Sequence, residues 1–267
     1  MRIFIKTSAW AVWAARLARL VIPLYVVSVL AHHIELIDGP IFVTMFALAT
    51  ILGMAALAVG LIAFLRLWYT GDHGWGMASW ANLVGIAVAG LLGLTVLLAT
   101  QHPQTNQVTT NINNPPPLGA PSLETPAKQA ELEQMAQEVA ISFPTAVTRA
   151  YPLGPNDILP LLERQIAAKG WDNVNRQSAT ETETLYMGDV KTWLGFKDRV
   201  SIRAIYDQNQ SEIDMRSASY FGEADLGTNG RRIQSFLADL DSAVRKKLLD
   251  LSRAAPLQEE PSTEEAD

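Results

Sequence analysis

Two long apolar runs near the N-terminus constrain the fold more than any other feature of the sequence. Residues 41–65 contain no charged side chain, and residues 81–99 contain only Asn82 and Thr95 as polar residues. A helix needs about 20 consecutive apolar residues to cross a bilayer, whereas a helix on a soluble protein is apolar on one face only. Both runs are therefore predicted to be transmembrane helices.

A third apolar segment precedes them. Residues 20–31 are apolar around Pro23 but too short to cross a bilayer. Extension to residues 17–36 gives a full span with Arg19 near one end, where the guanidinium can reach the membrane surface. The alternative is a signal peptide that is cleaved after Ala31. The long approach to the segment, which contains two tryptophans, favours a retained helix.

The charges around these helices predict their orientation. In the first hundred residues the basic side chains lie in the N-terminal segment or near the end of the second helix, and the loop 31–40 has none. Because Lys and Arg are retained in the cytoplasm, we expect a cytoplasmic N-terminus, three crossings and an external C-terminal part. In a bacterium this is a multi-pass inner-membrane protein with a periplasmic domain. The basic residues are Arg2, Lys6, Arg16, Arg19 and Arg66.

The third predicted helix carries a face of small side chains. Ala81, Gly85, Ala89 and Gly93 recur every four residues, and small residues let helix backbones approach closely in lipid. We expect this face to pack against the second helix. The alternative is a dimerisation face or a docking groove for a membrane-protein partner. The second helix offers its own small residues, Ala49, Gly53, Ala56 and Gly60.

The composition changes after residue 100. Residues 101–123 are rich in Pro, Asn and Thr, which predicts an extended linker. Residues 124–253 are predicted to form one domain, and residues 254–267, rich in Glu and Pro, to be disordered. The chain has a formal net charge of −6 although its first hundred residues are slightly basic, so this second part is acidic. An acidic domain argues against binding to nucleic acid.

The predicted domain has the α+β pattern. Helices are expected at both ends, and four strands lie between them, one of which alternates Val200, Ile202 and Ala204 as a half-buried strand does. Helices that are segregated from antiparallel strands are typical of an α+β fold. The expected helices are 124–139, a second one capped by Asn156 or Asp157 and ended by Gly170, and 230–252. The expected strands are 171–176, 180–187, 200–206 and 212–219.

The densest polar cluster lies where the last predicted strand turns into the last predicted helix. Amide donors at a helix start bind anions, and nearby arginines and serines would strengthen a site for phosphate or carboxylate. The favoured alternative is a structural network in which Thr228 or Asn229 caps the helix and Asp225 pairs with Arg216 or Arg232. The candidate ligand-binding residues are Arg216, Ser217, Ser219, Asp225, Asn229, Arg231 and Arg232.

Other chemistry has little support in the sequence. There is no cysteine, which excludes disulfides, thiolate metal sites and cysteine nucleophiles. The four histidines lie near the membrane helices, so no serine of the domain has a histidine of the same domain to activate it. We expect no metal site and no cofactor, and the sequence leans against an enzyme. The charged run 197–199 is expected to be a solvated turn.

A series of short motifs runs through the second part in a defined order. The last ones are Asp-Met-Arg-Ser-Ala-Ser at 214–219, Gly222, Asp-Leu-Gly at 225–227, Asn229 and Arg-Ile at 232–233. Before them come 109–110, 151–152, 170–171 and 195–198. Over about residues 107–240 the chain resembles the uncharacterised bacterial family called domain of unknown function 1499. It departs from that pattern at Tyr220, where arginine is common, and at Arg199, where an acidic residue is common.

The resemblance implies domain limits and an envelope setting, and it supplies no reaction. We expect a binding or scaffolding protein of the cell envelope, with the lipid bilayer and an envelope or membrane protein as partners. One alternative is a small-anion or ligand-binding domain, hydrolytic or not, with its site at the last strand–helix junction. Another is an accessory subunit that docks through the third helix. The oligomeric state is open.

Overall fold

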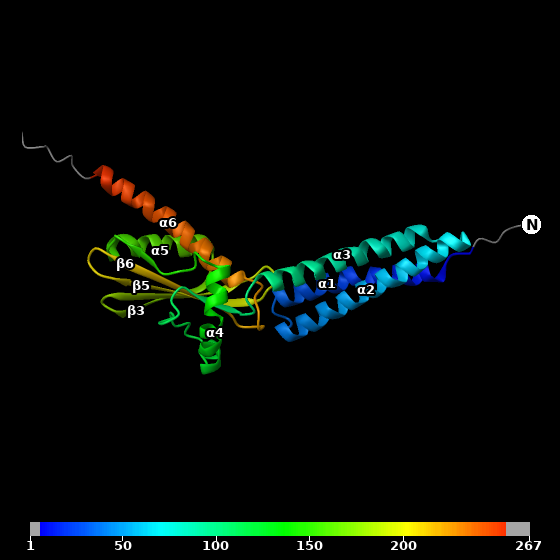
Figure 1. Ribbon diagram of the computed structural model, residues 1–267, viewed down its shortest axis with the longest axis horizontal. Coiled ribbons are helices and arrows are strands. Elements are labelled where there is room, and N and C mark those ends of the chain that lie inside the picture. Colours follow the sequence, from blue (N-terminus) through cyan, green and yellow to red (C-terminus); the bar gives the residue numbers. More distant parts are fainter. Residues whose placement is uncertain (1–5, 255–267) are drawn as a thin grey trace, which may run out of the picture.

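The computed structural model describes residues 6–254, and Figure 1 shows an elongated molecule with a three-helix bundle at one end and a domain of strands and helices at the other. The expected α+β class, preceded by three long apolar helices, is confirmed. The predicted disordered tail, residues 254–267, lies outside the described residues except for Ala254.

Each helix of the bundle is long and apolar enough to cross a membrane. The first helix begins well before the predicted position 17, because a face of small side chains that includes Ala11, Ala14 and Ala18 is buried against the other two helices. Pro23 lies inside this helix without ending it. The three helices are α1 (Ala9–His33), α2 (Gly39–Thr70) and α3 (Trp75–Gln101).

The small-residue face of α3 packs against α2 over only half of its length. Ala81 is fully buried, and a Cβ atom at Gly85 would lie 2.4 Å from the Cβ atom of Leu57. Ala89 is half-buried, whereas Gly93 is exposed and would have no neighbour within 4 Å of an added Cβ. The predicted contact with α2 therefore uses the first half of the face.

The domain is built on one antiparallel sheet with the strand order β1-β6-β5-β4-β3. The short strands β1 and β2 pair with consecutive stretches of the same edge of β6. All four long strands were expected: β3 and β4 extend beyond the predicted C-terminal ends but begin one and three residues later than predicted, and β5 and β6 begin three residues and one residue earlier. The strands are β1 (Gln107–Thr109), β2 (Arg149–Tyr151), β3 (Asp172–Thr180), β4 (Glu183–Lys191), β5 (Lys197–Tyr206) and β6 (Ser211–Ser219).

The hydrophobic core lies between one face of the sheet and two helices. An apolar stripe of the last helix is buried, and β5 and β6 contribute alternate residues from the other side; the stripe consists of Ile233, Phe236, Leu237, Leu240 and Val244. Figure 1 shows α5 and α6 running along the sheet. The helices of the domain are α4 (Pro126–Ser142), α5 (Pro155–Lys169) and α6 (Thr228–Ala254), and a short 3-10 helix covers Pro121–Leu123.

The start of α5 differs from the prediction. Gly154 rather than Asn156 or Asp157 is the N-cap residue, because Pro155 supplies the fixed backbone angle that suits the first helical turn. A Cβ atom at Gly154 would lie 2.1 Å from the backbone oxygen of Gln208, so this position requires glycine. The predicted stop is confirmed: Gly170 ends the helix in the left-handed conformation with φ of 62°.

The predicted linker, residues 101–123, is not a free tether, because its central part forms part of the domain. Residues 107–109 form β1, and the following residues 110–124, here called the strap, contact the sheet face opposite the core. Three sheet arginines donate to strap carbonyls: Arg203 to Asn114 at 2.6 Å, Arg199 to Leu118 at 2.9 Å and Arg216 to Leu123 at 3.5 Å. Side chains from distant strands thus satisfy a proline-rich backbone that forms no ladder of its own.

Candidate functional site

The strand–helix junction between β6 and α6 is held first by Asp225. Its carboxylate accepts hydrogen bonds from the backbone N–H groups of Gly227 at 2.8 Å and Asn229 at 2.5 Å. The capping residue is therefore Asp225, rather than the expected Thr228 or Asn229. Burial raises the pKa of the Asp225 carboxyl, and the two amide hydrogen bonds oppose that rise.

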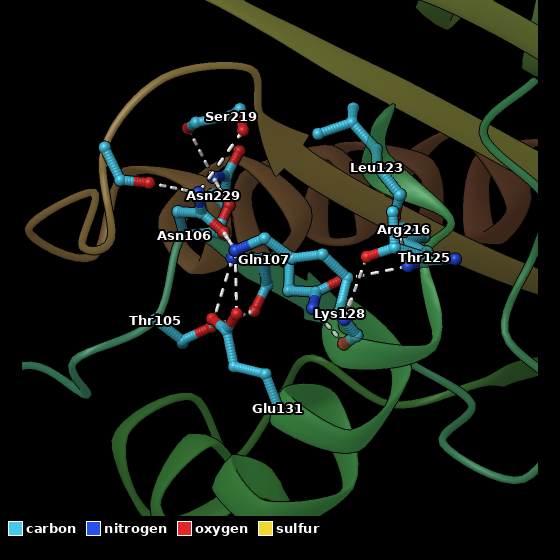
Figure 2. A network of polar contacts seen from close by, with 11 residues as sticks. Thr105, Asn106, Gln107, Leu123, Thr125, Lys128, Glu131, Arg216, Ser219 and Asn229 are labelled. Carbon is cyan, nitrogen blue, oxygen red and sulfur yellow. Dashed lines mark hydrogen bonds and ion pairs between the residues drawn. The ribbon is translucent and has the colours of Figure 1, made fainter. Parts of the chain in front are cut away.

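Asn229 is fully buried and ties three segments together. Its Oδ1 atom accepts hydrogen bonds from the Ser217 hydroxyl at 2.6 Å and the Arg232 guanidinium at 2.5 Å. Its amide nitrogen donates to the backbone oxygen of Asn106 at 2.9 Å and to the Ser219 hydroxyl at 3.0 Å. Figure 2 shows Asn229 and Ser219 grouped with Asn106. All hydrogen-bonding positions of the Asn229 side chain are thus occupied by protein.

Arg232 pairs with Asp198. The sequence had suggested a pair with Asp225, which does not form. The Nη2 atom of Arg232 lies 2.5 Å from Asp198 Oδ2, and the Asp198 side chain is 2% exposed. Asp225 is engaged by backbone amides, whereas Asp198 lies at the start of β5 and opposite Ser219 in the sheet register. The ion pair therefore links α6 to the sheet. It also shows that the run 197–199 is not a solvated turn.

Arg216 lies on the other face of the sheet, because neighbouring residues of a strand point to opposite sides. It donates to the Gln107 side chain at 2.9 Å and lies with Leu123, apart from Asn229 (Figure 2). Within the described residues Arg216 forms no ion pair and its Nε atom has no hydrogen-bond partner, although the charge of Glu124 acts on it from beyond ion-pair distance. Burial lowers the pKa of the Arg216 guanidinium. The predicted cluster is thus divided between two faces.

Arg231, the last member of the cluster, and the neighbouring Asp214 of β6 also have structural partners. Arg231 is exposed, and its Nη1 atom lies 2.9 Å from His102 Nε2 at the end of α3. Asp214, on the strap side, forms a buried ion pair with Arg203 at 2.7 Å and accepts a hydrogen bond from Thr148 at 2.6 Å. In the described part of the chain no group of three His, Asp or Glu side chains is placed to hold a metal ion.

A second candidate site lies where the domain meets the bundle. The turn between β4 and β5, residues 192–196, packs on the loop between α1 and α2. Lys197 and Lys191 both bind the Glu35 carboxylate, at 2.8 Å and 3.2 Å. The hydrogen bond from Lys197 and that from Lys191 lower the pKa of Glu35. Phe196 stacks edge-on against the His32 ring, with 4.7 Å between the ring centroids.

This contact encloses a half-open cavity of about 330 Å³, here called the junction pocket. Sequence reasoning missed it, because its walls come from the α1–α2 loop, the β4–β5 turn and the loop after β6. The one available signal was the motif at 195–198, whose glycine lies so close to α1 that an added Cβ atom would be 3.0 Å from the Cα atom of His33. Its walls include His32, Glu35, Phe196, Lys197, Tyr220 and Phe221.

The comparisons with known proteins identify the family. The family described as "Protein of unknown function (DUF1499)" matches residues 98–240, more than half of the chain. No curated protein and no solved structure matches the chain significantly. The matched region begins in the last turn of α3 and includes β1, the strap, the sheet and the first half of α6. The chain therefore belongs to the DUF1499 family.

Proposed function

We propose that this protein is a binding or scaffolding protein of the bacterial cell envelope, anchored in the inner membrane by its three helices and working at the periplasmic membrane surface. The observation that carries the proposal is the contact between the β4–β5 turn and the α1–α2 loop. Two ion pairs to Glu35 and the aromatic contact of Phe196 hold the domain against the ends of the helices. A domain held in this way works at the membrane surface.

The orientation follows from the positions of the basic residues. Arg16 and Arg19 lie in the first half of α1 and Arg66 lies one turn before the end of α2, and these ends of the two helices are remote from the domain in Figure 1. Positive residues favour the cytoplasmic side, so the domain lies on the opposite side.

Binding is favoured over catalysis by the state of the polar groups. Asn229, Arg232 and Asp198 engage one another, and Asp225 engages the backbone, so the junction offers no free acid–base pair. A catalytic acid or base needs access to a substrate proton. The polar junction is best explained as a clamp between α6 and the sheet.

The orientation is tested with single cysteine substitutions. The wild-type sequence contains no cysteine, so each introduced cysteine is the only thiol of its variant. Ala168→Cys lies on the exposed side of α5, and Thr70→Cys at the end of α2 is its matched control in the opposite compartment. In intact cells a membrane-impermeant maleimide is expected to label Ala168→Cys, and to label Thr70→Cys only after lysis. The reverse pattern would refute the periplasmic placement.

A small-anion site is the second candidate function, and Arg216 is the observation that favours it. This guanidinium is 4% exposed and its partners in the described chain are neutral. The nearby carboxylate of Glu124 acts on this guanidinium without forming an ion pair with it, and a buried cation that lacks a direct counter-ion is costly, so a bound anion would stabilise the protein. Phosphate should then raise the unfolding temperature of the wild-type protein but not that of Arg216→Gln. An equal effect on both proteins would exclude this site.

A further inference from the structure

The junction pocket lies at the level where a membrane surface meets the domain. Its floor is the loop between α1 and α2, and the apolar spans begin within one turn of that loop. Three large apolar side chains around it are exposed to solvent: Ile34 at 69%, Leu36 at 74% and Trp193 at 80%. Tryptophan favours the interface between lipid and water. These side chains are therefore placed to contact lipid.

The walls of the pocket combine an apolar side with a polar one. Phe196 and Phe221 stack in parallel with 5.6 Å between their ring centroids, and Leu36 completes the apolar side. The polar side contains Lys197 and His32. His32 is 8% exposed, and its Nε2 atom has no hydrogen-bond partner among residues 6–254. An amphipathic ligand fits such walls better than a uniformly polar one.

The positive groups at the pocket favour an anion. Lys191 and Lys197 share the carboxylate of Glu35, and Lys197 is the one lysine among the described residues that line the pocket. Asp38 also lines the pocket, but its carboxylate accepts the Ile41 N–H group at 3.1 Å, where the positive end of the α2 dipole offsets its charge. The two lysines balance these two carboxylates, so a phosphate group next to Lys197 would meet that ammonium group and the positive end of the α2 dipole.

From this position, these walls and this charge we infer that the junction pocket binds one anionic phospholipid of the surrounding leaflet. The phosphate lies at Lys197, and the start of an acyl chain lies along Phe196, Phe221 and Leu36. The volume of about 330 Å³ is at the lower end of the range of small-molecule sites, about 300–1,000 Å³, so it holds a headgroup and the glycerol region rather than a whole lipid. This inference rests on the proposed function, because it requires the helices to lie in a bilayer.

Lipid retention by the full-length protein in detergent tests the inference, with native mass spectrometry as the measurement. Phosphatidylglycerol, phosphatidylcholine and glycerol phosphate are added separately. We expect the wild-type protein to retain one phosphatidylglycerol, to retain phosphatidylcholine about tenfold less, and not to retain glycerol phosphate, which has no acyl chain.

The variants locate the site. Lys197→Gln should lower retention of phosphatidylglycerol about tenfold, and Lys197→Arg should preserve it. Lys246→Gln is the matched control, since Lys246 is an exposed lysine in the part of α6 remote from the bundle. Lys191→Gln, which leaves the Lys197–Glu35 pair in place, is a second variant that should also weaken retention and serves if Lys197→Gln fails to fold.

Three results overturn the inference: equal retention by Lys197→Gln and the wild type, equal retention of the two phospholipids, or binding of glycerol phosphate as tight as that of the lipid. The last result would assign the pocket to a free soluble anion. The cysteine-labelling pattern is independent of these results. If the pattern holds and lipid retention does not depend on Lys197, only the pocket inference fails, whereas a reversed pattern refutes the proposed function.

Discussion

Replacement of Asn229 by alanine should destabilise the domain strongly, because this side chain is the centre of the clamp between α6 and the sheet. It is fully buried and makes four hydrogen bonds, one of them to the charged Arg232. Two of its partners retain another contact in the variant: Arg232 keeps its ion pair with Asp198, and the Asn106 backbone oxygen still accepts a hydrogen bond from the Ser219 N–H group at 2.8 Å. The Ser219 hydroxyl loses the Asn229 amide that donates to it.

The expected loss follows from these contacts. The net contribution to the free energy of unfolding is about 0.5–1.5 kcal/mol for each neutral hydrogen bond and about 1.5–3 kcal/mol for one to a charged group. Because some partners retain other contacts, we expect the variant to lose about 3–5 kcal/mol. With a urea dependence of about 2 kcal/mol per molar, the midpoint of unfolding should fall by about 2 M. Asn209→Ala is the matched control, because Asn209 lies in an exposed turn and its side chain has no hydrogen-bond partner among the described residues.

The assay is urea unfolding of the full-length protein in detergent, followed by the change in tryptophan fluorescence relative to a matched Trp171→Phe protein, so that the difference reports Trp171. That ring stacks on Phe236 of α6 with 5.4 Å between the centroids, so it reports separation of the helix from the sheet. A Trp193→Phe background leaves Trp171 as the only tryptophan of residues 102–254. If Asn229→Ala shifts the midpoint no further than Asn209→Ala does, the clamp interpretation is wrong and Asn229 is free for another role.

Three further perturbations test other parts of the structure. Gly85→Leu should destabilise the bundle by about 1–3 kcal/mol or more in thermal unfolding, because its Cβ atom would overlap α2, whereas Gly93→Leu should leave stability unchanged; if Gly93→Leu alters migration on a native gel, that end of α3 docks a partner, and unchanged migration counts against docking. Gly154→Ala should lower the urea midpoint by a similar free energy, since its Cβ atom would lie 2.1 Å from a backbone oxygen, and an unchanged midpoint would contradict the close approach. The lysine contacts lower the pKa of Glu35 below 4.5, so their contribution is present above that value and is lost as pH falls through the lowered pKa. Hydrogen-exchange protection of residues 192–196 should fall in that acid range and should show no such step in Glu35→Gln; a step that persists in the variant would assign it to another group.

Local patterns in the sequence predicted the long helices and the four long strands, but not the short strands β1 and β2. Uninterrupted apolar runs predict α2 and α3, because a helix that spans a bilayer is surrounded by lipid and therefore has no polar face. The alternation of Val200, Ile202 and Ala204 predicts β5, and Gly170 predicts the end of α5, because side-chain periodicity and backbone conformation depend on neighbouring residues. The same period of two already implies that Arg216 and Ser217 point to opposite faces of β6, so one split in the candidate cluster was readable before the structure.

The tertiary structure alone decided which distant groups satisfy one another. The strap lacks a regular hydrogen-bond ladder, and only the sheet register brings Arg199, Arg203 and Arg216 to its carbonyl groups. Arg232 and Asp198 are separated by many residues, and their contact depends on how α6 crosses the sheet. The junction pocket likewise requires three loops from separate parts of the chain to meet. Hydrogen bonds and ion pairs act over a few ångströms in space. The number of residues between two groups in the sequence does not give their distance in the folded protein.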